Sequence, residues 1–286
     1  KRVTWPDENE EHRSTHFGQR SVKGSESASI SVSDEALLNF GQIGGFYNTG
    51  SNLQALIDAC ASSDIPDARI SLVISNRKAA YGLVRAQSAT PPIPTDYLAL
   101  APFLKGPEIA TDPGSTATRP RTRADYDLQV ARMVVQHGRP DLVVLAGWMH
   151  ILSPEFLDVL EGKTDVPPPI QSATAAAETS TSTTATPARI SPQIPIINLH
   201  PALPGAFDGA NAIHRAYDAF QSGEINKTGV MVHYVVQEVD RGEPIVVKEI
   251  ELKQGESLED LEARIHQVEH VAIVEATKKV LEGISS

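Results

Sequence analysis

Two polar residues, Asn198 and His200, end a short apolar run in IINLHP and are the first candidates for chemistry. Residues two apart on a β-strand point to the same face, so we expect this amide and this imidazole to project together. At the end of a parallel strand the pair suits addition to a carbonyl, with the amide stabilising an oxyanion and the imidazole relaying protons. The same pattern also fits a capping Asn beside a hydrogen-bonded surface His.

A third candidate, Asp240, lies in the polar turn VQEVDRGEP between two predicted strands. The ordinary interpretation is an Asx turn that Gly242 completes. If the turn folds over His200, the Asp240 carboxylate would raise the pKa of that imidazole above about 6.5 and hold a water for proton transfer.

An anion site is indicated at the start of the first predicted helix, where Gly50, Ser51 and Asn52 precede the periodic run LQALIDAC. Free amides and the positive end of the helix dipole attract a phosphate group. A plain helix N-cap is the alternative interpretation.

The residues His266, Glu269 and His270 spell H-x-x-E-H, the pattern of the inverted zinc proteases. A catalytic zinc site needs a third protein ligand and an open position, and only 16 residues follow His270. We therefore expect no metal. His233, inside the alternating run VMVHYV, is interpreted as structural or pocket-lining.

The hydropathy pattern alternates predicted strands and helices, which favours an α/β fold: a mostly parallel, twisted, Rossmann-type sheet with helices on both faces. The predicted strands are 70–75, 142–147, 196–200, 228–236 and 244–252. The predicted helices are 51–60, 79–86, 123–137, 154–160, 212–222 and a last one from Ser257 that ends before Gly283.

The predicted domain covers residues 47–286 and contains two insertions. Residues 1–46 are polar and aperiodic and are expected to be disordered or aberrant. The first insertion is a proline-rich loop at 87–120, and the second is a Ser/Thr/Ala-rich tether at 162–193, to which we assign no structure.

Composition excludes several functional classes. The 286 residues carry a net charge of −11, which disfavours nucleic acid and membrane surfaces as partners. The single cysteine, Cys60, excludes an intramolecular disulfide and fits a reducing compartment, so we expect a water-soluble cytoplasmic protein. The chain begins at Lys1 instead of Met, which suggests a fragment or an incomplete gene model.

Together these pieces resemble the phosphoribosylglycinamide formyltransferase family. The matching stretches run in order between residues 50 and 283: GSNLQALIDAC, ISLVISNRKAAYGLVRA, DLVVLAGWMHILSPEFL, INLHPALPGAFDGANAIHRAY, TGVMVHYVVQEVDRGEPIV and ARIHQVEH. The resemblance implies a formyltransferase-like fold and transfer of a formyl group from 10-formyltetrahydrofolate to the amine of phosphoribosylglycinamide in purine (IMP) biosynthesis, without a metal.

The resemblance also implies roles for individual residues. Asn198 would polarise the formyl oxygen, His200 would relay protons, and Asp240 would organise His200 and water. The phosphate would lie on Gly50, Ser51 and Asn52, and Glu269 would contact the ribose or glycinamide end. The folate would lie along Arg123, Met149, His150, Ile151, Leu152, Asn198, Val236, Gln237, Glu238, Val239 and Asp240.

The chain departs from the family at two places. His150 stands where the family has an arginine, and ALLNFGQIGGFYNT precedes Gly50 where an apolar strand should run directly into the phosphate loop. We therefore expect the first strand to be absent or badly altered. A non-catalytic folate or nucleotide binder and a formyltetrahydrofolate hydrolase stay open as alternatives. A methionyl-tRNA formyltransferase is not expected, because that family carries a basic C-terminal RNA-binding domain and this acidic sequence ends soon after its last predicted helix.

Overall fold

The computed structural model describes residues 50–112, 115–137, 139–148, 150–168, 170 and 189–284, and the backbone of 35–40. All of these residues belong to one compact unit, Ser33–Ser286. No described helix is long and apolar enough to cross a membrane.

The centre of this unit is a sheet of seven described strands in the order β3-β2-β1-β6-β7-β8-β9. The strands are β1 (Glu35–Phe40), β2 (Arg69–Ser75), β3 (Thr95–Tyr97), β6 (Leu142–Leu145), β7 (Ile196–His200), β8 (Lys227–Tyr234) and β9 (Pro244–Glu251). The pairs from β3 through β7 are parallel, and β8 and β9 continue the sheet in antiparallel fashion. The expected mostly parallel α/β sheet is therefore confirmed.

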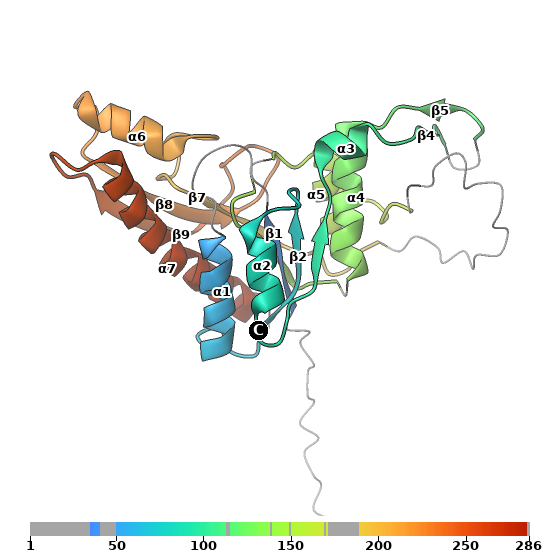
Figure 1. Ribbon diagram of the computed structural model, residues 1–286, viewed down its shortest axis with the longest axis horizontal. Coiled ribbons are helices and arrows are strands. Elements are labelled where there is room, and N and C mark those ends of the chain that lie inside the picture. Colours follow the sequence, from blue (N-terminus) through green and yellow to red (C-terminus); the bar gives the residue numbers. More distant parts are fainter. Residues whose placement is uncertain are drawn as a thin grey trace, which may run out of the picture. The chain divides into compact units, whose positions relative to one another are not determined.

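Helices cover both faces of the sheet, as expected. They are α1 (Ser51–Ser62), α2 (Tyr81–Ser88), α3 (Leu100–Leu104), α4 (Arg123–Gln136), α5 (Pro154–Leu160), α6 (Ala212–Gln221) and α7 (Leu258–Ile284). On β2, Val73 packs into one core with α1, α2 and α7, whereas its neighbours Leu72 and Ile74 pack into a second core with α4 and α5. This alternation places the two helix layers on opposite faces, with α4 and α5 apart from α1 and α2 (Figure 1).

The first strand is expected from the sequence to be absent or badly altered, and the expectation that it is absent is wrong. Strand β1 lies between β2 and β6 and pairs with both in parallel, with Leu37 opposite Leu72 and Val143. The sequence ALLNF supplies an apolar run that pairs with the ladder groups of both neighbours, which would otherwise lack partners. The prediction failed because it required this strand to run directly into Gly50. The other residues of the 1–46 segment lie outside the described residues.

Both insertions contain more structure than expected. Within 87–120 the chain forms β3, α3 and a hairpin of β4 (Ile109–Ala110) and β5 (Thr118–Arg119), and Phe103 packs edge-on against Tyr126. Within 162–193 an isolated bridge joins Asp165 to Arg189, and Ile190 is buried. Scattered apolar residues anchor these segments without a periodic pattern. The interior of the tether, 171–188, lies outside the described residues.

Helix ends mostly follow the expected capping signals. The Ser153 side chain accepts the amide of Phe156 at the start of α5, and Ser257 accepts the amide of Asp260 at the start of α7. The end of α7 differs from expectation, because the helix continues through Gly283 to Ile284.

Candidate active site

Strand β7 brings the first two candidates to one pocket. Asn198 and His200 both line it, and the His200 side chain is almost fully buried, with 4% of its surface exposed. The pocket measures about 460 Å³, within the ordinary size range of small-molecule sites. The two residues therefore share one space, as their spacing on the strand predicts.

Asp240 lies over this strand end, in the turn between β8 and β9. Its Oδ2 is 3.5 Å from Nδ1 of His200, and its Oδ1 accepts a hydrogen bond from Nδ2 of Asn198 at 3.4 Å. The backbone amide of Gly209 donates to Oδ2 at 2.8 Å. The turn thus folds over His200, which local sequence alone could not show.

His233 joins this group and was interpreted from the sequence only as structural or pocket-lining. Its Nε2 lies 3.5 Å from Oδ1 of Asp240 and 3.4 Å from Nδ2 of Asn198, and it lines the pocket. Its Nδ1 donates to the Tyr234 carbonyl at 2.8 Å, which leaves Nε2 facing the cluster. The signal that could have found it is strand register, because His233 is the partner of Asn198 in the β7–β8 ladder.

The pKa values of Asp240 and His200 are both shifted, and the shift of His200 differs from the one expected. Burial raises the pKa of Asp240, but bonds from His233 and Gly209 and the two imidazoles outweigh it, so the pKa lies below its ordinary value. The prediction that the pKa of His200 lies above about 6.5 is wrong: burial dominates and lowers the pKa of this imidazole, although the Asp240 carboxylate raises it as expected. The site therefore pairs an ionised Asp240 with a His200 that tends toward the neutral form.

The predicted anion cradle opens into the same pocket. Gly50, Ser51 and Asn52 line it at the start of α1, where no side chain caps the helix. Gly50 has a φ of 67°, and a Cβ there would lie 2.9 Å from Cα of Gly82, so only glycine fits. Asn52 donates to Oε2 of Glu269 on α7 at 3.3 Å, which fixes the two elements together.

Glu269 is buried, with 6% of its surface exposed, and burial raises its pKa despite the opposing effects of His266 and Asn52. The lining includes no Lys or Arg among the described residues, so positive charge in the pocket can come only from histidines. A phosphate there would be held by neutral amides and the helix dipole.

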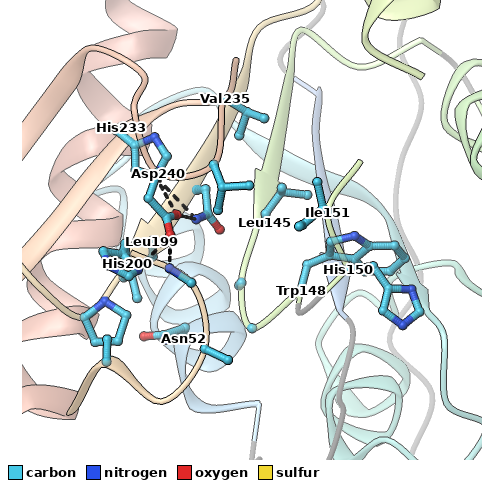
Figure 2. A pocket seen from close by; sticks show the side chains of 18 of the residues that line it. Asn52, Leu145, Trp148, His150, Ile151, Leu199, His200, His233, Val235 and Asp240 are labelled. Carbon is cyan, nitrogen blue, oxygen red and sulfur yellow. Dashed lines mark hydrogen bonds and ion pairs between the residues drawn. The ribbon is translucent and has the colours of Figure 1, made fainter. Parts of the chain in front are cut away.

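The expected folate-side residues mostly line the same pocket, including His150, Ile151, Leu152 and the 236–239 turn. Figure 2 shows Asp240 and His233 on one side of the pocket and Trp148 and His150 on the other. Nε2 of His150 is 3.3 Å from Nδ2 of Asn76, and burial together with the charge of Arg123 lowers the pKa of this imidazole. Met149 lies outside the described residues.

Arg123 is not among the lining residues. Its Nε pairs with Oδ1 of Asp127 at 2.9 Å, and its guanidinium donates to the Ile151 carbonyl at 2.7 Å. The buried Asp127 also accepts the amide of Ser153 at 3.2 Å. In this structure Arg123 therefore supports the segment that lines the pocket instead of facing the pocket itself.

The H-x-x-E-H residues do not assemble a metal cluster in the described part of the chain. No three His, Cys, Asp or Glu side chains gather there in a metal-binding group. Glu269 is instead hydrogen-bonded to Asn52, and His266 lines the pocket.

Three buried polar atoms of pocket-lining residues have no hydrogen-bond partner among the described residues: Oδ1 of Asn52, Nε1 of Trp148 and Nδ1 of His150. Buried polar atoms are normally satisfied. The pocket is therefore suited to an elongated polar ligand that reaches from the anion cradle to the Trp148 end.

Comparisons with known proteins agree with this geometry. The formyl transferase family model matches residues 46–164 and 189–277. A phosphoribosylglycinamide formyltransferase of Schizosaccharomyces pombe is 42% identical over 82% of this chain and 93% of its own length, and that of Dictyostelium discoideum is 39% identical over 80% and 92%. The crystal structure of glycinamide ribonucleotide transformylase 1 from Geobacillus kaustophilus superposes with a TM-score of 0.62 at 26% identity, covering 87% and 98% of the two chains. The chain belongs to the formyl transferase family.

Proposed function

We propose that the chain transfers the formyl group of 10-formyltetrahydrofolate to the amine of phosphoribosylglycinamide, a step of purine biosynthesis. One observation carries the proposal: a single pocket contains both an anion cradle, at Gly50–Asn52, and a cluster suited to acyl transfer, Asn198, His200 and Asp240. The relatives named above support the same acceptor and the same reaction class.

In the proposed reaction the acceptor amine attacks the formyl carbon and a C–N bond forms. The bond from that carbon to N10 of the folate then breaks, and the proton lost by the amine goes to N10. Holding the two substrates in one pocket lowers the barrier through orientation, without a covalent enzyme intermediate.

Asn198 is placed to stabilise the oxyanion. Its Nδ2 carries two hydrogens and lies 3.4 Å from both Oδ1 of Asp240 and Nε2 of His233. Asp240 accepts one hydrogen, and the other can be donated to the formyl oxygen when Nε2 of His233 carries its own hydrogen toward Asp240. This second hydrogen becomes most useful as negative charge develops in the tetrahedral intermediate.

His200 is placed to carry the proton. Its Nδ1 faces Oδ2 of Asp240 and its Nε2 faces the Ala206 carbonyl at 3.4 Å, so both neighbours are acceptors. A neutral imidazole can donate to only one of them, and a proton arriving from the amine completes both bonds. The ionised Asp240 stabilises that imidazolium, while burial favours its return to the neutral form.

The substrates fit the two ends of the pocket. The phosphate would lie on the Gly50–Asn52 amides and the ribose or glycinamide end near Glu269. The folate would lie along His150, Ile151 and Leu152 and the 236–239 turn, with Trp148 as an additional donor.

A direct assay tests this proposal. Loss of 10-formyltetrahydrofolate is followed with and without phosphoribosylglycinamide, for the natural chain, His200→Ala and the control His214→Ala, whose imidazole is largely exposed. We expect acceptor-dependent transfer that His200→Ala lowers by about 10²- to 10⁴-fold and the control leaves unchanged. Acceptor-independent loss would indicate a hydrolase, and ligand binding without turnover a non-catalytic binder. Either outcome refutes the transferase.

A further inference from the structure

The loop between β7 and α6 crosses directly over Asp240 and has an unusual backbone. Gly205, Phe207, Gly209 and Asn211 all have positive φ, between 52° and 79°. Asn adopts this region readily, but the bulky Phe207 adopts it only when surrounding contacts enforce it. The loop therefore needs anchors outside its own backbone.

Two adjacent contacts join this loop to the turn between β8 and β9, which contains Asp240 and Arg241. Gly209 donates its amide to Oδ2 of Asp240 at 2.8 Å, and the residues next to them form an ion pair, with the Arg241 guanidinium 2.6 Å from Oδ2 of Asp208. Asp208 precedes Gly209 and Arg241 follows Asp240. The ion pair and the amide bond are thus neighbouring cross-links between the same two segments.

Further contacts hold the Asp208 side of this connection. The Arg215 guanidinium on α6 donates to the carbonyls of both Phe207 and Asp208, the latter at 2.7 Å. Arg241 also covers the far end of the loop, because a Cβ at Gly205 would lie 3.9 Å from its Nη1. Contacts therefore hold the loop on both sides of the Gly209 amide, which donates to Asp240.

We propose that Asp208 and Arg241 are positioning residues, whose ion pair holds the Gly209 amide on Asp240 and so keeps the carboxylate between His200 and His233. Neither residue lines the pocket, so neither contacts a substrate there. Their effect passes through the carboxylate, whose second oxygen is shared by Asn198 and His233. The expected loss of kcat rests on the proposed function, whereas the expected weakening of the Gly209–Asp240 bond does not.

The experiment compares Asp208→Asn, Arg241→Gln and the charge-reversed double variant Asp208→Arg with Arg241→Asp in the full chain. The control is Arg264→Gln, which removes an Arg–carboxylate pair of the same length, 2.6 Å to Glu256, away from the pocket lining. Each protein is measured for kcat, for KM of both substrates and for hydrogen exchange at the Gly209 amide.

We expect both single variants to lower kcat by about two- to fivefold and to speed Gly209 exchange by a similar factor, because a partly exposed ion pair contributes on that scale. Both KM values should stay within about twofold of the natural chain, and the reversed pair should recover kcat and exchange. The control should change neither.

The proposal is overturned if the single variants keep the natural kcat, if Gly209 exchange speeds up without any loss of kcat, or if the reversed pair recovers neither quantity. A natural chain with no formyl transfer refutes the proposed function instead, and Gly209 exchange then still reports whether the ion pair holds the amide bond.

Discussion

Nε2 of His233 lies 3.5 Å from Oδ1 of Asp240, on the oxygen opposite the one that faces His200. One buried carboxylate thus lies between two imidazoles that come from neighbouring strands of the sheet. This arrangement explains how Asp240 keeps a pKa below its ordinary value although only 9% of its surface is exposed. It also makes His233 a member of the candidate site.

Replacing His233 with Gln should lower kcat about tenfold or more and leave KM of both substrates nearly unchanged. The amide cannot carry the positive charge that favours ionised Asp240, and the carboxylate loses one of its partners. Steady-state kinetics at pH 7 measure this, with His214→Gln on α6 as the matched control. A His233→Gln enzyme with the natural kcat would show that His200 and Asn198 suffice to hold Asp240.

The sequence predicts the site residues that lie close to one another along the chain. Asn198 and His200 are two apart on one strand, and Gly50–Asn52 start a helix, so periodicity and helix-end chemistry predict their placement. Asp240 is a candidate from the sequence only on the condition that its turn folds over His200. Its approach to His200 depends on a turn between distant strands, which no local pattern encodes.

Other features depend on packing that a single sequence does not specify. His233 enters the site through the β7–β8 register, and β1 is recognisable only once β2 and β6 are seen on either side of it. The sign of the His200 pKa shift was wrong because the sequence names the neighbouring carboxylate but not the degree of burial. Arg123 is placed along the folate by the family resemblance alone, and its pairing with the buried Asp127 emerges only from the structure.

Glu269 should make stability depend on pH. Because burial raises its pKa, the folded chain keeps this proton at pH values where the unfolded chain has lost it. The contribution of Glu269 to stability is therefore fully present below its ordinary pKa of 4.5 and is lost as the pH rises toward the folded value. Urea unfolding of Glu269→Gln should match the natural chain at pH 4 and show greater stability at pH 7. Glu259→Gln, exposed on the same helix, is the control and should show no such difference.

The tether should tolerate a short deletion but not a long one. Removing 171–188 leaves the Asp165–Arg189 bridge and the buried Ile190, so folding and activity should be nearly unchanged. Removing 162–193 also deletes Ile190 and the Arg139 bond to the Pro192 carbonyl, and should cost about 2–4 kcal/mol of stability. Thermal unfolding and kcat of the two deletions decide this. If the two deletions have the same stability and kcat, the whole segment 162–193 is a plain insertion, as the sequence predicts.

Arg123 should act on folate binding through Ile151. Arg123→Gln removes the bond to the Ile151 carbonyl and leaves the buried Asp127 without its cationic partner, which loosens the lining segment. We expect KM for the formyl folate to rise about three- to tenfold, with KM for phosphoribosylglycinamide unchanged. Arg132→Gln, on the same helix but bonded to Pro167, is the control. A rise in both KM values would point to general unfolding of the α4 region instead.

Gly242, the single glycine of the turn between β8 and β9, should not tolerate a larger residue. A Cβ there would lie 1.6 Å from the Tyr234 carbonyl oxygen and 3.2 Å from Nδ1 of His233, so β8 and the turn would have to separate. That carbonyl accepts the His233 bond, and the Tyr234 amide donates to the Glu243 carbonyl at 3.0 Å, so both contacts would be lost.

We expect Gly242→Ala to destabilise the chain by about 2–4 kcal/mol in urea unfolding and to lower kcat more than His233→Gln does, because Asp240 moves as well. Gly283→Ala is the matched control, since a Cβ there contacts nothing within 4 Å and helix α7 should gain slightly from alanine. If Gly242→Ala were as stable and active as the control, the turn would have room that this structure does not show, and the tight packing assigned to Asp240 would be wrong.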